Sequence, residues 1–426
     1  AEATTRSNQL DLIPADMIQT VEVIKALTPD MDADAIGGSI NLITRKAAGT
    51  RTSVTVGRGD NTLDQAGKIV QLSGMHSNRS EDNNFGYMFN FSFYDNWTGS
   101  DNVEAEWDDE GNIVEHDIRK YLVHRERKSL GLRFDYNLGN TELYTNLNYN
   151  DRDDYENRYR QRIKDLDEGE GSQEVRRQTK AGLPGNEYGR LEDQKLFSYK
   201  FGGTSLLDKL KLDYSFKISE ASELRPNERY LALRLKKQTA VWNQSTEKPN
   251  FTFSNAIAAD LNNSWDFRNL IEERRDTDEK ARSFKVDADY NFSDNLKIEA
   301  GLKISTRKKE RRNEFYEFEP VDEDAFLADA FSNIVSQNKS EWLNDGDGTS
   351  YNSGSYVSRE FVGNLDLSNT ALFERVVVEE ELAGNFKASE DITSFYGMAT
   401  YDYSDRLLIV GGLRLERTSL YDLEAR

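Results

Sequence analysis

Apolar and polar residues alternate with a period of two along much of this chain. In residues 85–93 an aromatic side chain stands at every odd position, and Gly86, Asn90 and Ser92 are among the residues between them. Successive side chains of a β-strand point to opposite faces, so this pattern predicts strands with one apolar and one polar face. The alternation predicts roughly eleven such strands. The clearest of the others are 130–138, 143–149, 210–218, 284–292, 296–304 and 407–415.

The connections between these predicted strands are of two lengths. Tight turns are expected at 138–140, 206–208, 293–295 and 404–406. The hairpins are separated by long polar segments, at about 98–124, 154–189, 223–276 and 313–388. Outer-membrane β-barrels alternate in this way between short periplasmic turns and long extracellular loops. The sequence therefore predicts an all-β chain that forms part of a transmembrane antiparallel β-barrel, with a first strand at about 51–58.

A different pattern occupies residues 21–45, before the first barrel strand. A short apolar strand at 21–25 breaks at Thr28-Pro29, and an acidic run with Asp30, Asp32 and Asp34 follows. After Gly37 and Gly38 the chain becomes apolar again from Ser39 to Arg45. Proline fixes a turn and glycine adopts positive φ without steric cost, so a strand, a loop and a second strand are expected here.

This stretch resembles the end of the plug domain of TonB-dependent outer-membrane receptors. The matching residues are the lead-in Ile13-Pro14, the strand 21–25, the loop 29–38 and the segment Asn41 to Thr44. The chain departs from the family at Ala26, where many members have Gly, and in the acidic run, which replaces a Leu-Tyr-Gly segment. The residues assigned to the plug motif are Pro29, Asp30, Asp32, Asp34, Gly37, Gly38 and Asn41.

The resemblance implies a division into two parts. Residues 1–48 are expected to be the C-terminal part of the plug domain, and residues 49–426 the first half of a barrel. Barrels of this family close with 22 strands around the plug, so about eleven predicted strands form half of one. We expect the sequence to begin and end within a longer protein, because the plug motif lies close to residue 1 and an open sheet leaves unpaired edges in lipid.

The resemblance also implies a function. A receptor of this family in the outer membrane of a Gram-negative bacterium imports a scarce substrate, either a siderophore, a metal chelate, cobalamin or an oligosaccharide. The inner-membrane TonB complex supplies the energy through a segment that precedes the plug and is not in this sequence. Two alternatives are a passive porin-like channel, which needs no plug, and a soluble secreted β-rich glycan-binding or adhesion protein.

Composition agrees with a barrel and excludes several other classes. Only 37% of the 426 residues are hydrophobic, and no apolar run is long enough for a transmembrane helix. A barrel with a polar interior accounts for the mean hydropathy of −0.77. The net charge of −21 argues against binding nucleic acid, whose phosphates require cations on the protein.

Motifs for catalysis and for metal binding are missing from the sequence. The chain has no Cys, and His76, His116 and His124 form no H-E-x-x-H pair, so we expect no enzyme activity, no cofactor and solvated histidines. The run from Asp30 to Asp34 begins like a calcium loop. However, Ala35 stands where an EF-hand needs Gly, and Asn41 where it needs Glu. An EF-hand is rejected and no metal ligands are assigned, with a looser cation site as the minor alternative.

Charged and aromatic residues suggest three kinds of contact. The polar strand faces should direct cations toward the plug aspartates, namely Arg133, Lys211, Lys217, Lys285 and Lys303. At the outer rim, contact with outer-membrane lipid and lipopolysaccharide phosphates is expected from Arg307, Lys308, Lys309, Arg311 and Arg312, with a solvated loop base as the alternative. Outer-loop tryptophans that could stack on a small-molecule or oligosaccharide substrate, or pack locally, are Trp107, Trp242, Trp265 and Trp342.

Overall fold

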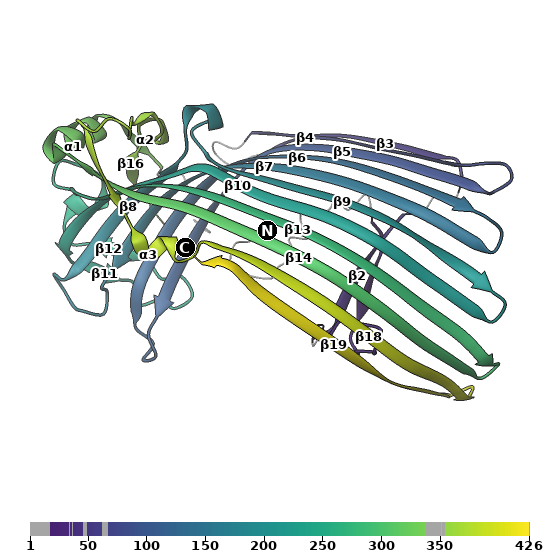
Figure 1. Cartoon of the computed structure of the whole chain (residues 1–426). Coiled ribbons are helices and arrows are strands. Elements are labelled where there is room, and N and C mark those ends of the chain that lie inside the picture. The colour runs from purple at the N-terminus through teal and green to yellow at the C-terminus, as the bar shows by residue number, and fades with distance from the viewer. Residues whose placement is uncertain are drawn as a thin grey trace.

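The protein consists mainly of one 13-stranded antiparallel sheet of long strands (Figure 1). The structure is a computed structural model that describes residues 18–33, 35, 37–45, 49–61, 67–337, 351 and 354–425. One edge strand is β3 (Arg51–Asp60) and the other is β19 (Leu407–Ala425). Between them lie β4 (Lys68–Arg79), β5 (Phe85–Trp107), β6 (Ile113–Asn137), β7 (Thr141–Lys164), β8 (Gln173–Ala181), β9 (Arg190–Leu207), β10 (Leu210–Gln238), β13 (Asp266–Ser293), β14 (Leu296–Pro320), β17 (Phe373–Val377) and β18 (Phe386–Ser404).

Eleven of these strands cross the sheet at its tight-turn end. Of the thirteen strands, β8 and β17 pair with their neighbours only at the opposite end, where β8 takes the place of β9 between β7 and β10. All four predicted tight turns are present, and Gly139 and Asp208 adopt positive φ in two of them. The strand count and the partial antiparallel barrel predicted from the alternation are confirmed.

The strands extend well beyond the predicted limits. Much of the segments predicted as long loops continues the ladder, so that β5 runs to Trp107 and β6 begins at Ile113. The alternation of apolar and polar residues weakens there because both faces carry many polar side chains. Hydrophobic periodicity reveals a strand only where one face is apolar, which explains why these extensions were not predicted.

The two faces of the sheet differ near the tight turns. The apolar face carries exposed side chains such as Phe89, Phe134, Phe284 and Leu413, the last of which is 81% exposed. This band, which we call the apolar belt, suits contact with lipid, because soluble proteins rarely expose contiguous apolar surface of this kind. Among the described residues, no helix is long and apolar enough to cross a bilayer.

At the opposite end, the apolar face is covered by a small folded layer. We call the described parts of 239–265 and 321–373 the cap. It contains β11 (Ala240–Trp242), β12 (Phe251–Phe253), η4 (Ala256–Ala259), α1 (Glu323–Ser332), β15 (Ile334–Ser336), β16 (Ser355–Val357) and α2 (Arg359–Asn364). Figure 1 shows α1, α2 and β16 gathered at this end of the sheet.

The cap is held by a hydrophobic core and by helix capping. Leu231, Leu233 and Leu270 of the sheet are buried against Trp265 and Val362 of the cap. Helices α1 and α2 are capped at their N-termini by Asp322 and Ser358, whose side chains accept hydrogen bonds from the backbone N–H groups of Ala325 and Phe361. Two short helices complete the described fold, η3 (Pro184–Asn186) and α3 (Glu379–Leu382).

A separate antiparallel hairpin forms the N-terminal part of the described chain. Strand β1 (Ile18–Ile24) pairs with β2 (Ser39–Thr44), as the sequence predicts. Gly38 has φ +122°, and a Cβ there would lie 2.7 Å from the carbonyl oxygen of Ile24, so the return of the loop requires glycine. We call residues 18–45 the plug hairpin. The lead-in Ile13-Pro14 and the motif residue Asp34 lie outside the described residues.

Candidate functional site

The plug hairpin is attached to the polar face of the sheet through Asp32. Its carboxylate accepts hydrogen bonds from Lys303 Nζ at 2.6 Å and from Arg414 Nη2 at 3.1 Å. Lys303 lies on β14 and Arg414 on β19, with β18 between them, so one side chain bridges two strands that are not neighbours. Arg414 is oriented by Glu416 at 2.8 Å and by Ser394 at 2.7 Å.

The sequence predicted part of this attachment. Lys303 is one of the five cations expected to meet the plug aspartates, whereas Arg414 was not singled out. Its position could have been inferred, because Leu413 and Leu415 belong to the apolar belt and place the residue between them on the polar face. Two other expected cations pair with acids of their own strand, Lys285 with Asp287 at 3.1 Å and Lys211 with Asp213.

A cavity adjoins the attachment point. It has a volume of about 220 Å³ and lies between the plug hairpin and strands β10, β13, β14, β18 and β19. Its charged lining includes Asp32, Lys217, Lys303, Arg307, Glu390 and Glu416. The cavity is therefore polar and is lined in part by Asp32, the plug side chain that is ion-paired to two strands of the sheet.

The remaining motif residues have local roles where they are described. Asn41 donates a hydrogen bond from Nδ2 to Glu22 Oε2 at 3.1 Å, which ties β2 to β1. Pro29 and Asp30 lie in the loop between the two strands, where the backbone N–H of Met31 bonds to the carbonyl of Thr28 at 3.0 Å. Gly37 has open space around it, in contrast to Gly38.

Farther from the tight turns, the polar face carries a buried network of charges. Lys180 bridges Glu156 and Glu228 at 2.8 Å each, and Arg190 pairs with Glu156 at 3.1 Å. Burial alone would raise the pKa of Glu156, but the charges of Lys180 and Arg190 outweigh it and lower that pKa. The same balance lowers the pKa of Glu228. Both acids are thus ionised in the folded protein at neutral pH.

Arginines follow one another along β7 beyond this network. Arg158, Arg160 and Arg162 share the polar face, and Arg162 stands opposite Arg176, which stands opposite Arg234 on β10. Burial and, after it, the charges of Arg158 and Arg162 lower the pKa of Arg160 to about 10. Like charges directly opposite each other destabilise a sheet. We call Arg158, Arg160, Arg162, Arg176 and Arg234 the arginine row.

Acidic residues neutralise the arginine row only in part. Arg162 is held by Asp117 at 2.8 Å and by Glu115 at 2.7 Å, whereas Arg160 lies 4.0 Å from Asp117. Burial raises the pKa of Asp117, but hydrogen bonds from Arg162 and Arg119 outweigh burial and lower it. Sequence reasoning missed this row. The available signal was a charged residue at every even position from 152 to 164.

The four predicted ligand-contacting tryptophans lie in different environments. Trp107 and Trp242 meet edge to face with ring centres 5.9 Å apart, at the tips of their hairpins. Trp265 is only 1% exposed and packs in the cap core with its Nε1 bonded to the carbonyl of Asp260 at 3.0 Å. Its expected contact with substrate is therefore wrong, and the packing alternative holds. Trp342 lies outside the described residues.

The basic cluster predicted to contact lipopolysaccharide is divided between the two faces. Side chains alternate along β14, so Lys308 and Arg312 are on the side of the apolar belt, and Arg307, Lys309 and Arg311 on the polar face. Arg307 pairs with Glu279 at 3.3 Å, and Arg311 donates to the carbonyl of Gly384 at 3.0 Å. Of the five, only Lys308 and Arg312 face the side on which outer-membrane lipid would lie.

The expectation of solvated histidines is wrong for two of the three. His116 is 1% exposed beneath the cap, and His124 is 7% exposed between strands β5 and β7. His116 Nε2 lies 3.1 Å from the carbonyl oxygen of Pro249, and its ring contacts Phe251. The cap that buries His116 folds back from a distant part of the chain, which local sequence patterns do not reveal. His76 lies 2.8 Å from the hydroxyl of Thr52.

Two groups of potential metal ligands also come together among the described residues. One consists of Asp95, His124 and Glu126, and the other of Asp151, Asp153 and Asp193. We assigned no metal ligands from the sequence, because each group joins two residues of one strand to a third on a neighbouring strand, and they meet only through the register of the sheet.

The fold and site define the class of protein: part of a transmembrane β-barrel wall with a hairpin ion-paired to its polar face. Residues 215–424 match the family model described as TonB dependent receptor-like, beta-barrel. This part of the chain is therefore a TonB-dependent receptor-like β-barrel segment, and the family of that name consists of transport receptors. No curated protein sequence matches the chain.

Several solved structures resemble the chain at low sequence identity. The ferric citrate transporter FecA in its unliganded form is 10% identical, with a TM-score of 0.28. The ferric yersiniabactin uptake receptor FyuA from Yersinia pestis is 9% identical, with a TM-score of 0.26. Both matches cover 94% of this chain and 60% of the other. The siderophore receptor PiuA from Acinetobacter baumannii is 10% identical, with a TM-score of 0.26, over 94% of this chain and 69% of the other.

Proposed function

We propose that the chain is the plug end and first barrel half of an outer-membrane receptor that imports a small anionic substrate with TonB-coupled energy. In this proposal residues 1–48 belong to the plug and 49–426 to the barrel of a Gram-negative outer-membrane protein. The observation that carries it is the ion pairing of Asp32 with Lys303 and Arg414. This contact holds a separate hairpin on the face of the sheet that would form the barrel interior.

The strength of the contact suits a plug that must move. The Asp32 side chain is 47% exposed, so water and salt screen its attraction to both cations. Ion pairs in such a setting contribute roughly 0–1 kcal/mol each. The contact therefore positions the hairpin at rest without resisting a pull from the periplasm. A passive channel has no use for a releasable plug.

The charges of the polar face support an anionic substrate. The arginine row lies along the interior wall, and Lys217, Lys303 and Arg307 line the cavity above Asp32. Guanidinium groups bind carboxylate and phosphate groups in two-pronged hydrogen bonds. Siderophores, metal chelates and acidic oligosaccharides carry such groups. Trp107 and Trp242 are proposed as further contacts at the outer end.

Contact with the outer leaflet is proposed for the two basic residues on the outer side. Lys308 and Arg312 lie beyond the apolar belt, on the face that would meet lipopolysaccharide phosphates. Arg312 is already paired with Asp276 at 2.9 Å and with Asp278 at 3.5 Å. The phosphates would therefore share Arg312 with these carboxylates.

Uptake by the parent protein in strains with and without TonB tests the main proposal. Asp32→Asn should lower TonB-dependent uptake several-fold or increase passive leakage of small solutes, because the hairpin loses both ion pairs. Glu22→Gln is the matched control, since it removes a plug carboxylate whose described hydrogen bond is to Asn41 of the same hairpin. Uptake that persists without TonB would favour the porin-like channel. A parent protein recovered outside the membrane, without heat-modifiable gel mobility, would favour the secreted β-rich module.

A further inference from the structure

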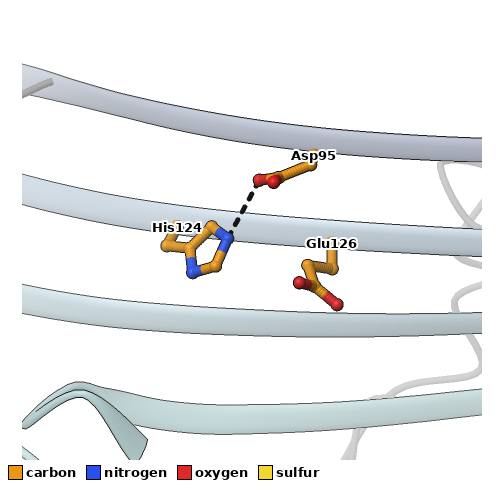
Figure 2. A group of neighbouring side chains, drawn as sticks. All are labelled: Asp95, His124 and Glu126. Carbon is orange, nitrogen blue, oxygen red and sulfur yellow. Dashed lines mark hydrogen bonds and ion pairs between the residues drawn. The ribbon is translucent and has the colours of Figure 1, made fainter. Parts of the chain in front are cut away.

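A histidine and two carboxylates meet on the apolar-belt side of strands β5 and β6. Figure 2 shows Asp95, His124 and Glu126 there, with Asp95 and His124 joined by a hydrogen bond. The register dictates the arrangement, because Asp95 stands opposite Glu126, and Trp97 stands opposite His124 two residues further along. One ligand atom from each of the three residues lies within 4.8 Å of the others.

The imidazole of His124 is held in one position. It is stacked on Trp97, with ring centres 4.0 Å apart and planes inclined by 13°, and the ring of Tyr155 lies 5.4 Å away on a neighbouring strand. Its Nδ1 is 3.1 Å from Glu187 Oε2, and its Nε2 is 3.0 Å from Asp95 Oδ1. Both ring nitrogens therefore face carboxylate oxygens.

This geometry requires a positive species between Nε2 and Asp95. When the Nδ1–H group donates a hydrogen bond to Glu187, the Nε2 lone pair points at a carboxylate oxygen of Asp95. The lone pair and this oxygen repel each other unless a proton or a cation lies between them. A histidine that donates one N–H to a carboxylate while the other nitrogen binds a metal is the usual arrangement at protein metal sites. Glu187 would be that orienting carboxylate.

We propose that Asp95, His124 and Glu126 bind a divalent transition-metal ion such as Zn²⁺, Ni²⁺ or Co²⁺, with Glu187 as the residue that orients His124. At bond lengths of about 2.1 Å, two ligands lie about 3.0 Å apart at the right angle of an octahedral ion and about 3.4 Å apart at the tetrahedral angle of Zn²⁺. Nε2 and Asp95 Oδ1 are separated by 3.0 Å, so an octahedral ion fits as it stands and Zn²⁺ needs a small outward movement of one ligand. The imidazole nitrogen selects against Ca²⁺ and Mg²⁺, and the absence of thiolates selects against Cu⁺. The two carboxylates balance the charge of the ion, and water completes the coordination.

The site connects the barrel wall to the cap. Glu187 belongs to the strap, residues 182–189 between β8 and β9. The strap lies beneath α2, where a Cβ on Gly363 would be only 2.4 Å from the carbonyl oxygen of Gly182. A metal ion on β5 and β6 would fix His124, and through Glu187 it would hold the strap against the wall. This role is independent of substrate import.

Calorimetric titration of the parent protein in detergent with Zn²⁺ tests the site. We expect the native protein to bind one Zn²⁺ ion per chain at this site. The variant His124→Gln should lose this binding. Glu187→Gln should keep the stoichiometry and weaken binding roughly 10- to 100-fold, as is usual when an orienting residue is removed. The control is Asp193→Asn, which removes charge from the neighbouring carboxylate group that has no imidazole, on strand β9, and should leave Zn²⁺ binding unchanged.

A second readout separates binding at His124 from other binding. Co²⁺ bound through an imidazole gives visible absorption bands that should change in His124→Gln and in Asp95→Asn, while circular dichroism shows that both variants keep the sheet. Asp95→Asn also serves if His124→Gln does not fold. Zn²⁺ binding of equal affinity in all variants, or no binding at about 100 µM Zn²⁺ where functional sites are normally filled, would overturn the proposal. His124 would then serve only as a hydrogen-bonding link between Asp95 and Glu187.

Discussion

At the scale of single residues, His116 shows how burial fixes a protonation state. Its ring lies under the cap with Nε2 donating to the carbonyl of Pro249, and Nδ1 has no hydrogen-bond partner among the described residues. Burial lowers the pKa of His116 from 6.5 to about 4, an effect that the Pro249 hydrogen bond and the charge of Asp117 only partly offset. A proton on Nδ1 would place an unpaired charge in the contact between β6 and the cap.

Acidification should therefore loosen the cap over His116. The unfolded or opened state binds a proton near pH 6.5 and the closed state only near pH 4, so closure is fully stable above 6.5 and loses stability as the pH falls between these values. The loss reaches about 2 kcal/mol at pH 5. Hydrogen exchange of residues 240–253, compared at pH 7 and pH 5, measures it.

His116→Gln is the control for this effect. A glutamine amide can still donate to the Pro249 carbonyl but does not titrate. At pH 5, residues 240–253 should therefore be better protected from hydrogen exchange in this variant than in the native protein under the same conditions. Equal acid sensitivity in both proteins would show that another group controls the cap.

At the scale of elements, the sequence predicts those parts of the fold whose pattern is local. The strands around Phe89, Phe284 and Leu302 could be predicted because they have one apolar face, and the hairpin around Gly38 because its turn residues are distinctive. The strand extensions could not, since their buried face is covered by cap residues more than a hundred positions away, as in the pairing of Arg229 with Leu365. The group around His124 depends on the register of β5 and β6, which the sequence does not specify.

The contact between α2 and the strap illustrates such an unpredictable element. Arg229 donates from Nη1 to the carbonyls of Val362, Gly363 and Leu365 at 3.2, 3.0 and 2.8 Å, at the end of α2 where the carbonyls lack helical partners. Gly363 allows α2 to approach the strap closely. An added Cβ would lie 2.4 Å from the Gly182 carbonyl oxygen and 2.8 Å from the ring of Tyr188.

Gly363→Ala should consequently detach the cap locally. Alanine favours a helix by up to about 1 kcal/mol over glycine, but the clash is with backbone, and overpacking of this kind costs about 1–3 kcal/mol. We expect faster proteolysis of residues 354–373 in the variant. Gly185→Ala is the matched control in the strap, because a Cβ there meets no atom within 4 Å. Equal protease resistance in both variants would contradict a close α2 contact.

At the scale of the whole molecule, the distribution of charge matters more than its sum. The chain has a net charge of −21, yet the interior wall carries the arginine row and the cations around the cavity. Charges facing a confined, low-dielectric space attract a ligand more strongly than charges dispersed in solvent. The negative net charge therefore says little about the charge of the substrate. The charged residues at the even positions from 152 to 164 are more informative, because they include the arginines of the interior wall.

Arg160 offers a test of the substrate's charge, because its ion pair with an acidic residue is long. It lies 4.0 Å from Asp117, which keeps hydrogen bonds from Arg162 at 2.8 Å when Arg160 is removed. A charged hydrogen bond to a ligand contributes about 1.5–3 kcal/mol, so Arg160→Gln should weaken uptake of anionic chelates by about tenfold or more. Uptake of neutral or cationic chelates of the same metal should not fall. Lys280→Gln removes one positive charge from an exposed side chain on the outer side and is the control for net charge. Equal losses in the two variants would mean that the arginine row does not contact the substrate.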